Sequence, residues 1–181
     1  GIHLTGTCGE LRPNHFHGGI DIKSARGIIG DAVFSAADGF ISRIKVDKSG
    51  YGNSLYVSHP NGYTTVYAHL DRFKPEIENW VKNQQYIKES FEIDVDLTHD
   101  KFPVSQGDEI GKMGNTGSSN GAHLHFEVRE TKTQNPINPL LFGFRVVDNI
   151  APKMHALKVY SLNEKREELD SKAVILVKMG E

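Results

Sequence analysis

Alternation of polar and apolar residues between positions 122 and 128 is the pattern that most constrains the fold of this chain. Because successive side chains of a β-strand point to opposite faces, such a run predicts a strand with one buried face. The residues of that buried face would be Ala122, Leu124, Phe126 and Val128. The opposite face then begins with His123 and His125, so that two imidazoles project from one side of the strand.

A second polar group lies near the start of the chain, in the run His17-Gly18-Gly19-Ile20-Asp21. A spacing of four would suit a helix, but each glycine costs about 1 kcal/mol in a helix interior, so we expect a turn leading into a strand. Two imidazoles on one strand face, joined by a distant histidine and a carboxylate, are ligands typical of a divalent transition metal, most naturally zinc. Three protein ligands would leave one position for water, which is typical of a catalytic site. Either pattern alone also occurs without a metal.

Further alternating runs, broken by turn residues, predict a mainly β protein. Residues 54–58 and 63–69 are predicted to form a hairpin, because Asn61-Gly62 between them is a strong turn signal. This hairpin would place His69 at or just past the end of a strand, where its side chain can reach over a sheet face. The other expected strands are 32–46, bent at Asp38-Gly39, and 110–113. The loop at 114–121 leads into the histidine strand, so we expect it to rim the site.

One helix is predicted at about residues 75–90. Pro75 suits a first helical turn, the acidic residues after it complement the helix dipole, and an apolar stripe follows the helical period. Residues 91–97 then alternate as a strand with an acidic outer face. We interpret residues 72–103 as an insertion on the β core, which either walls a groove, binds a partner or only packs against the body.

The character of the sequence changes near the end of the chain. Residues 149–152 are predicted to form a linker, and 157–162 and 173–179 two strands joined by a charged run. Because two strands alone are marginally stable in water, they either pack on the preceding core or begin a second β domain. We favour the second interpretation and divide the chain into a domain at 1–147 and a β-strand extension at 148–181.

Composition excludes several classes of protein. A net charge of −2 and an isoelectric point near 6.5 give no electrostatic case for binding nucleic acid or an acidic membrane surface. No apolar run approaches the roughly 20 residues that a transmembrane helix needs. Cys8 is the only cysteine, so no internal disulfide is expected, and only its proximity to histidines supports a thiol peptidase.

Taken in order, several short segments resemble the lysostaphin-type (LytM-like) zinc endopeptidases, which cut peptide cross-links in bacterial cell walls. The segments are Gly9-Glu10-Leu11-Arg12 to His17-Gly18-Gly19-Ile20-Asp21-Ile22, Gly50-Tyr51-Gly52-Asn53, Tyr67-Ala68-His69-Leu70, Gly114-Asn115-Thr116-Gly117 and His123-Leu124-His125-Phe126-Glu127. The resemblance covers roughly residues 9–130, and around His15-Phe16-His17 it is similar to the Gram-negative, Bacteroidetes-like subset. It implies an antiparallel, barrel-sandwich-like β core with one inserted helix.

For the site, the resemblance implies that His17, Asp21 and His125 bind one Zn²⁺ ion. His69 and His123 match the two other histidines of the family. One of them would take a proton from the zinc water as general base, and both would stabilise the oxyanion. The sequence leaves open which of the two is the principal base.

Other residues near these motifs have alternative roles. His15 also forms a His-x-His pair with His17 and could replace it as a ligand, although the family pattern favours His17. Glu127 shares the face of His125, and either orients that ring through its N–H or forms a surface salt bridge. The predicted substrate-binding residues are Tyr51, Asn53 and Asn115. A cleft walled by Tyr51, Tyr67 and the loop 115–120 would prefer small substrate residues.

The resemblance implies a peptide of peptidoglycan as substrate and a location in the periplasm or cell envelope. We therefore expect export, with a targeting segment removed ahead of Gly1. The alternative is a non-catalytic or autoinhibited module that binds cell wall or activates another wall hydrolase. Such relatives typically lack part of the ligand set, whereas all five polar positions are filled here. Residues 33–46 also resemble a biotinyl or lipoyl carrier half-barrel, but the lysine tip of such carriers has only a weak match at Lys112-Met113-Gly114.

Overall fold

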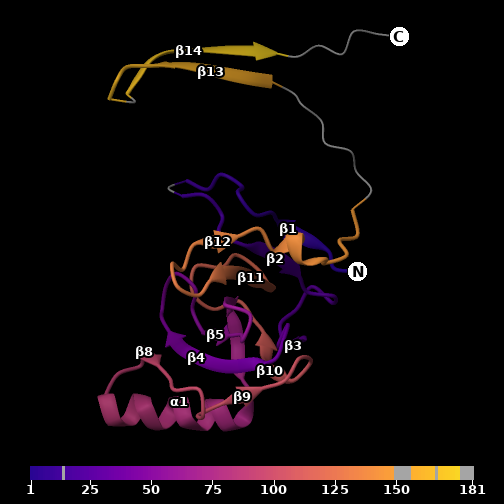
Figure 1. The fold of residues 1–181 in the computed structure, drawn as a ribbon, viewed down its shortest axis with the longest axis vertical. Coiled ribbons are helices and arrows are strands. Elements are labelled where there is room, and N and C mark those ends of the chain that lie inside the picture. The colour runs from indigo at the N-terminus through magenta and orange to yellow at the C-terminus, as the bar shows by residue number, and fades with distance from the viewer. Residues whose placement is uncertain (14, 149–155, 166, 176–181) are drawn as a thin grey trace. The chain divides into compact units, whose positions relative to one another are not determined.

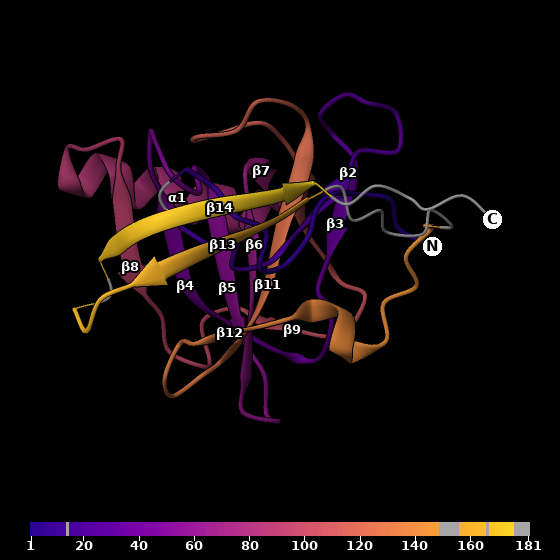
Figure 2. The same cartoon turned by 90° about the horizontal axis from the view of Figure 1, so that it is seen from above.

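The first part of the chain is built on one large antiparallel sheet in this computed structural model, which describes residues 1–13, 15–148, 156–165 and 167–175. Its strands follow the order β1-β2-β11-β6-β5-β4-β8, with β12 paired to β11 and β9 paired to β4 (Figure 1 and Figure 2). The strands span Leu4–Gly6 (β1), Ile20–Lys23 (β2), Gly39–Val46 (β4), Ser54–Ser58 (β5), Tyr63–Ala68 (β6), Ile93–Asp96 (β8), Pro103–Val104 (β9), His123–Glu130 (β11) and Pro136–Ile137 (β12).

A smaller antiparallel sheet supplies the second layer of the core. Its three strands, in the order β3-β10-β7, span Ala32–Phe34 (β3), Glu109–Met113 (β10) and Leu70–Phe73 (β7). One cluster of buried apolar side chains contains residues of both sheets, among them Ile41, Ile44, Leu55, Val33, Leu70 and Ile110. Burying an aliphatic side chain of this size contributes about 1.5–3 kcal/mol, so this cluster holds the two sheets together.

The predicted hairpin at Asn61-Gly62 is confirmed as β5 and β6. His59 N–H donates to Tyr63 O at 2.9 Å across the turn, and Gly62 takes a φ of 85° that favours glycine. Strand β6 ends at Ala68, so His69 lies just past the end of the strand, as the sequence predicted.

The predicted helix is also confirmed, as α1 at Pro75–Lys88. It ends slightly before the predicted residue 90, because Glu89 adopts a left-handed conformation with a φ of 48°. Buried Ile77 and Val81 pack it on the body, beside β8 (Figure 1 and Figure 2). Strand β8 pairs with β4, opposite Arg43–Val46, so the segment after the helix extends the large sheet.

Several short elements are absent from the sequence prediction. They are β1, β7, β9, β12 and a 3₁₀ helix at Pro139–Phe142 (η1). Strand β7 pairs with β10 in the small sheet, although its four residues, Leu70-Asp71-Arg72-Phe73, do not alternate between apolar and polar types as a strand pattern requires. Short strands of this kind depend on the pairing partner rather than on their own pattern.

Residues 1–147 and 148–181 form separate compact units. The described part of the second unit is an antiparallel hairpin of β13 (Ala156–Leu162) and β14 (Glu168–Ile175). Strand β14 begins at Glu168 rather than at the predicted Ala173, so part of the expected charged connection belongs to the strand. The predicted linker at 149–152 and the end of the predicted last strand, 176–179, lie outside the described residues.

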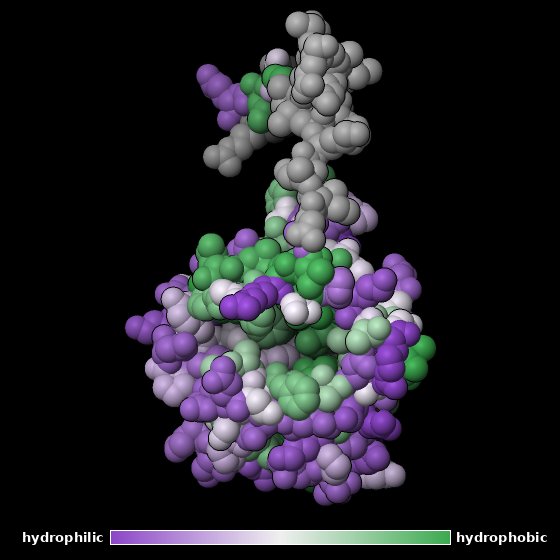
Figure 3. All heavy atoms as spheres, turned by 90° about the vertical axis from the view of Figure 1, so that its right-hand side faces the viewer, coloured by the Kyte–Doolittle hydropathy of each residue, from purple (hydrophilic) through white to green (hydrophobic). Residues whose placement is uncertain are grey.

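Within the described ranges, no helix has both the length and the apolar character needed to cross a membrane. Some large apolar side chains of the first unit are nevertheless exposed, including Ile28, Phe34 and Leu141. Figure 3 shows hydrophobic side chains gathered around a hollow on one face of this unit.

Candidate metal centre

Antiparallel pairing of β2 with β11 brings two predicted ligands together. In this register Asp21 lies opposite His125, and Lys23 lies opposite His123. Directly opposite residues carry their side chains on the same face of the sheet, with Cβ atoms about 4.5–5.5 Å apart. The predicted alternation along β11 is confirmed, since its opposite face is buried in the core through Leu124, Phe126 and Val128.

His17 reaches the same point from the turn before β2. Its N–H donates to Glu10 O at 2.8 Å, and its carbonyl accepts from Gly9 N–H at 2.8 Å. Gly19 lets the turn pass closely over β11, because a Cβ there would lie 2.2 Å from the carbonyl oxygen of Phe126. The glycine pair that argued against a helix therefore also sets the position of His17.

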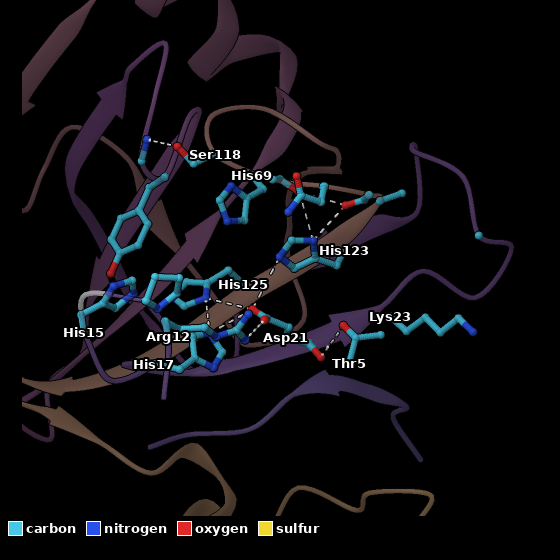
Figure 4. Close-up of a pocket in the computed structure, with 18 residues that line it drawn as sticks. Thr5, Arg12, His15, His17, Asp21, Lys23, His69, Ser118, His123 and His125 are labelled. Atoms are coloured by element: carbon cyan, nitrogen blue, oxygen red, sulfur yellow. Dashed lines mark hydrogen bonds and ion pairs between the residues drawn. The ribbon is translucent and has the colours of Figure 1, made fainter. Parts of the chain in front are cut away.

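The side chains of His17, Asp21 and His125 offer three ligand atoms at one point (Figure 4). His125 Nδ1 lies 2.9 Å from His17 Nε2 and 3.0 Å from Asp21 Oδ1, and His17 Nε2 lies 3.1 Å from the same oxygen. Each of these residues is at most 7% exposed. Two imidazoles and one carboxylate suit a catalytic zinc ion, which keeps a position open for water.

The outer nitrogen of each ligand histidine is held by a hydrogen-bond acceptor. His17 Nδ1 donates to the carbonyl of Thr7 at 2.9 Å, and His125 Nε2 donates to Glu127 Oε1 at 2.7 Å. Because a carbonyl or a carboxylate can only accept, the ring protons belong on these outer nitrogens. The lone pairs of His17 Nε2 and His125 Nδ1 are thus free to coordinate a metal, and the residues present fit a single zinc ion.

The carboxylate of Asp21 is held on both oxygens. Its Oδ2 accepts from Arg12 Nη2 at 2.9 Å, which leaves Oδ1 towards the histidines. Burial works against ionisation of Asp21, but hydrogen bonds with His125 and His17 outweigh it and keep its pKa well below the usual range. In His125, burial is outweighed by hydrogen bonds to Asp21 and Glu127, which raise its pKa. Since a metal competes with protons for the same nitrogen, affinity at this centre should fall at acidic pH.

His69 and His123, the two predicted catalytic residues, lie beside the three ligands (Figure 4). Their ring centroids are 4.8 Å apart, and His123 Nε2 lies 3.5 Å from Asp21 Oδ1. His69 Nδ1 donates to Thr116 O at 2.8 Å, and His123 Nδ1 donates to Gly121 O at 2.9 Å. In both rings, therefore, Nε2 is the nitrogen that can accept a proton.

His69 has two further features of a functional residue. Its φ of 60° is unusual for a residue other than glycine, and such conformations cluster at functional sites. Burial lowers the pKa of His69 to about 4. The ring is consequently neutral near pH 7, as a general base must be before it accepts a proton.

All five of these side chains line an open cavity of about 670 Å³. The N-terminal segment, the end of β2 with the loop after it, the turn before β5 and the loop before β11 form the rest of its wall. These further lining residues are Thr5, Arg12, Pro13, His15, Lys23, Gly27, Gly50, Tyr51 and Ser118–Ala122. A cavity of roughly 300–1,000 Å³ is typical of sites that bind small molecules or short peptide segments.

The predicted substrate-binding residues divide between the cavity and the protein framework. Tyr51 lines the cavity, but its hydroxyl donates to Glu127 Oε1. Asn53 does not line it: its amide donates to Leu70 O at 3.0 Å and so holds the start of β7. Asn115 is exposed and lies outside the lining residues of the described chain.

Tyr67 was expected to wall the cleft, and this expectation is wrong. Its side chain is 1% exposed, and its hydroxyl accepts from Ala36 N–H at 2.8 Å. In the pairing of β6 with β11, Tyr67 lies opposite Phe126, on the core face of the sheet. Alternation along β6 therefore places Ala68, opposite His125, on the face of the metal centre.

The two remaining alternatives concern Glu127 and His15. The carboxylate of Glu127 belongs to a buried network, because the residue is only 1% exposed, so a surface salt bridge is excluded. Burial opposes its ionisation, but hydrogen bonds from His125 and Arg129 prevail and lower the pKa of Glu127 to about 2. His15 lines the cavity but is not part of the three-residue group whose ligand atoms meet.

Sequence reasoning missed the groups that orient the histidines. The carbonyl oxygens of Thr7, Thr116 and Gly121 hold the outer nitrogens of three of the rings. Every residue has such a carbonyl, so no signal in the sequence distinguishes these three. Arg129 stands two residues after Glu127 on the same strand face, and this spacing was the available signal for its role.

Comparisons with known proteins point to one family. The profile of Peptidase family M23 matches residues 15–94 and 92–139. DD-carboxypeptidase/endopeptidase Mpg of Neisseria meningitidis serogroup B is 35% identical over 124 residues, which are 68% of this chain and 22% of that protein. Murein hydrolase activator NlpD of Escherichia coli K12 is 32% identical over 123 residues, which are 67% of this chain and 25% of that protein. The chain thus spans about a quarter or less of the length of these relatives.

Similarity to a solved structure supports the fold. The catalytic domain of the antimicrobial peptidase lysostaphin from Staphylococcus simulans superimposes with a TM-score of 0.53 at 22% identity, covering 78% of this chain and 89% of that one. The predicted mainly β, LytM-like fold is confirmed. From the profile match and the relatives together, this chain belongs to peptidase family M23.

Proposed function

We propose that residues 1–147 are a zinc-dependent endopeptidase domain that hydrolyses the peptide cross-links of bacterial peptidoglycan. The strongest support is the convergence of His17, Asp21 and His125 with His69 and His123 in one open cavity. Membership of family M23 and similarity to a DD-carboxypeptidase/endopeptidase support a peptide substrate. A periplasmic or envelope location, and residues 148–181 as the start of a further β domain, are parts of this proposal.

The chemistry follows from the orientation of each side chain. His17, Asp21 and His125 would hold the zinc ion, which supplies Lewis-acid activation of a water molecule and of the scissile carbonyl. Either His69 or His123 accepts the first proton at Nε2, because Nδ1 of each ring is already bonded to a carbonyl. Once protonated, that ring can donate from Nε2 to the oxyanion of the tetrahedral species.

An activator role is the second candidate function. Similarity to NlpD, a murein hydrolase activator, supports it. In that case the domain would bind cell wall or another hydrolase without cleaving peptide bonds. The complete set of ligands and proton acceptors favours catalysis, because a binding module has no need of proton acceptors around a metal.

Metal content and peptidoglycan digestion, measured together, test the proposal. The wild type should hold one zinc per chain and release cross-link fragments from purified peptidoglycan, and His125→Ala should lose both. His99→Ala is the control, because His99 is exposed and lies in the segment between α1 and β9. Stoichiometric zinc without cleavage by the wild type would favour the activator role, and a folded wild type without zinc would contradict the ligand assignment.

A further inference from the structure

His125 differs from the other histidines of the centre in the group that holds its outer nitrogen. His17, His69 and His123 each donate to a backbone carbonyl, at 2.8–2.9 Å. His125 instead donates from Nε2 to a carboxylate, Glu127 Oε1, at 2.7 Å. A carboxylate partner makes an imidazole a stronger metal ligand than a carbonyl partner does, because negative charge on the acceptor raises the basicity of the ring.

Two other side chains hold Glu127 in place. The Tyr51 hydroxyl donates to Oε1, and Arg129 Nε donates to Oε2 at 2.5 Å. Arg129 Nη2 also donates to the Tyr51 hydroxyl oxygen at 3.1 Å, which closes a ring of hydrogen bonds around the carboxylate. Glu127 is 1% exposed, so solvent does not compete for these bonds.

The fold makes this arrangement rigid. His125, Glu127 and Arg129 are alternate residues of β11 and therefore project from one face of the strand. Tyr51 comes from the turn before β5, and its ring stacks on the His125 ring with centroids 5.2 Å apart and planes at 28°. The imidazole is thus fixed both through its N–H and across its face.

We propose that Glu127 is a positioning residue for the metal centre, which orients His125 and strengthens it as a ligand, and that Tyr51 and Arg129 position Glu127. This inference rests on the proposed function, in which His125 is a zinc ligand. It gives Tyr51 a role other than the predicted contact with substrate, since the hydroxyl is already engaged.

Zinc affinity, measured by competition with a chelator, tests this inference without reference to catalysis. Glu127→Gln keeps an acceptor but removes its charge, and should weaken zinc binding about 10–100-fold, the usual effect of mutating such an outer partner. Tyr51→Phe keeps the stacked ring and removes one donor to the carboxylate, so it should weaken binding in the same direction by less. The double variant Glu127→Gln/Arg129→Gln leaves no unpaired buried charge, and zinc binding should still be weak.

The matched control is Arg43→Gln/Asp94→Asn, which neutralises another guanidinium–carboxylate pair of the same sheet, between β4 and β8. Its zinc affinity should equal that of the wild type. Thermal unfolding of the metal-free variants shows which of them fold. If Glu127→Gln does not fold, the zinc affinities of the double variant and of Tyr51→Phe test the inference in its place. A purely structural role for Glu127 predicts that the double variant regains wild-type affinity.

If zinc affinity changed by less than about twofold both in folded Glu127→Gln and in the double variant, the inference would be overturned, because mutation of an outer partner has a larger effect on metal affinity. This outcome leaves the proposed function intact. A wild type that binds zinc and shows the expected losses in the variants, but cleaves no peptidoglycan, would contradict the proposed function alone.

Discussion

The two ends of the large sheet are organised by different forces. Towards the β1 end, on β2 and β11, polar side chains fix one another, as His125 is fixed between Asp21 and Glu127. At the end formed by β4 and β8, buried Ile77 of α1 supplies apolar contact, and the polar links are exposed. We infer that a change of one polar group alters chemistry at the first end, whereas a change of packing alters stability at the second.

The largest effect is expected for His69→Asn, which should reduce hydrolysis without changing stability. Asparagine tolerates the positive φ of this position but cannot act as a base. Hydrolysis should fall about 10²–10⁴-fold, because His69 acts either as the general base or as a donor to the oxyanion, with zinc affinity and melting temperature close to those of the wild type. Peptidoglycan digestion and zinc titration measure these quantities. If His69→Asn unfolded more easily but kept its activity per folded molecule, His69 would serve stability rather than chemistry, and the contrast between the two ends of the sheet would be wrong.

The reverse behaviour is expected for Ile77→Ala in α1. Ile77 is 1% exposed, and shortening a buried isoleucine to alanine costs about 2–5 kcal/mol. Denaturant unfolding should show this loss, while zinc affinity stays unchanged. Ile87→Ala is the matched control, because the same substitution on the same helix removes a side chain that is 74% exposed. Equal effects of the two variants would mean that burial does not hold the helix in place.

Gly19→Ala should affect both properties at once, because it changes the backbone on which the metal centre is built. The new Cβ would meet Phe126 O at 2.2 Å and move the turn that carries His17. We expect a loss of about 1–3 kcal/mol in unfolding free energy, as for other overpacking substitutions, together with weaker zinc binding. Gly121→Ala has open space around its Cβ and provides the control. Wild-type zinc affinity in folded Gly19→Ala would show that the turn adapts.

The smallest effect is expected for Asp94→Asn. The hydrogen bond from Arg43 lowers the pKa of Asp94, so the ion pair stabilises the folded protein above the ordinary aspartate pKa and is lost as pH falls through the lowered value. Both side chains are more than a third exposed, and such pairs contribute less than about 1 kcal/mol. Unfolding free energies of wild type and variant should differ slightly at pH 7 and converge once the pH falls below the lowered pKa of Asp94. A difference that persists at low pH would not arise from the ion pair.

Local patterns predicted the elements that carry the site, but not their mutual register. Alternation and the Asn61-Gly62 turn were enough to predict β11, β5 and β6, because these signals depend only on neighbouring residues. Whether Tyr67 faces the core or the cavity depends on which face of β6 is buried. A shift of one residue in the pairing of β6 would exchange the two faces. Similarly, the carbonyl of Thr116 reaches His69 only through tertiary contact, so no local pattern predicts this hydrogen bond.

The short strands at the two ends of the large sheet are poor templates for pairing with another chain. The terminal strands β1 and β8 have three and four residues, and β8 alternates its apolar residues with Asp94 and Asp96. An open strand edge is a template for pairing with another chain, and short length and charge both weaken that template. The segment that follows the helix therefore has a role at high protein concentration: it closes the exposed side of β4 with a strand that a second molecule cannot readily extend.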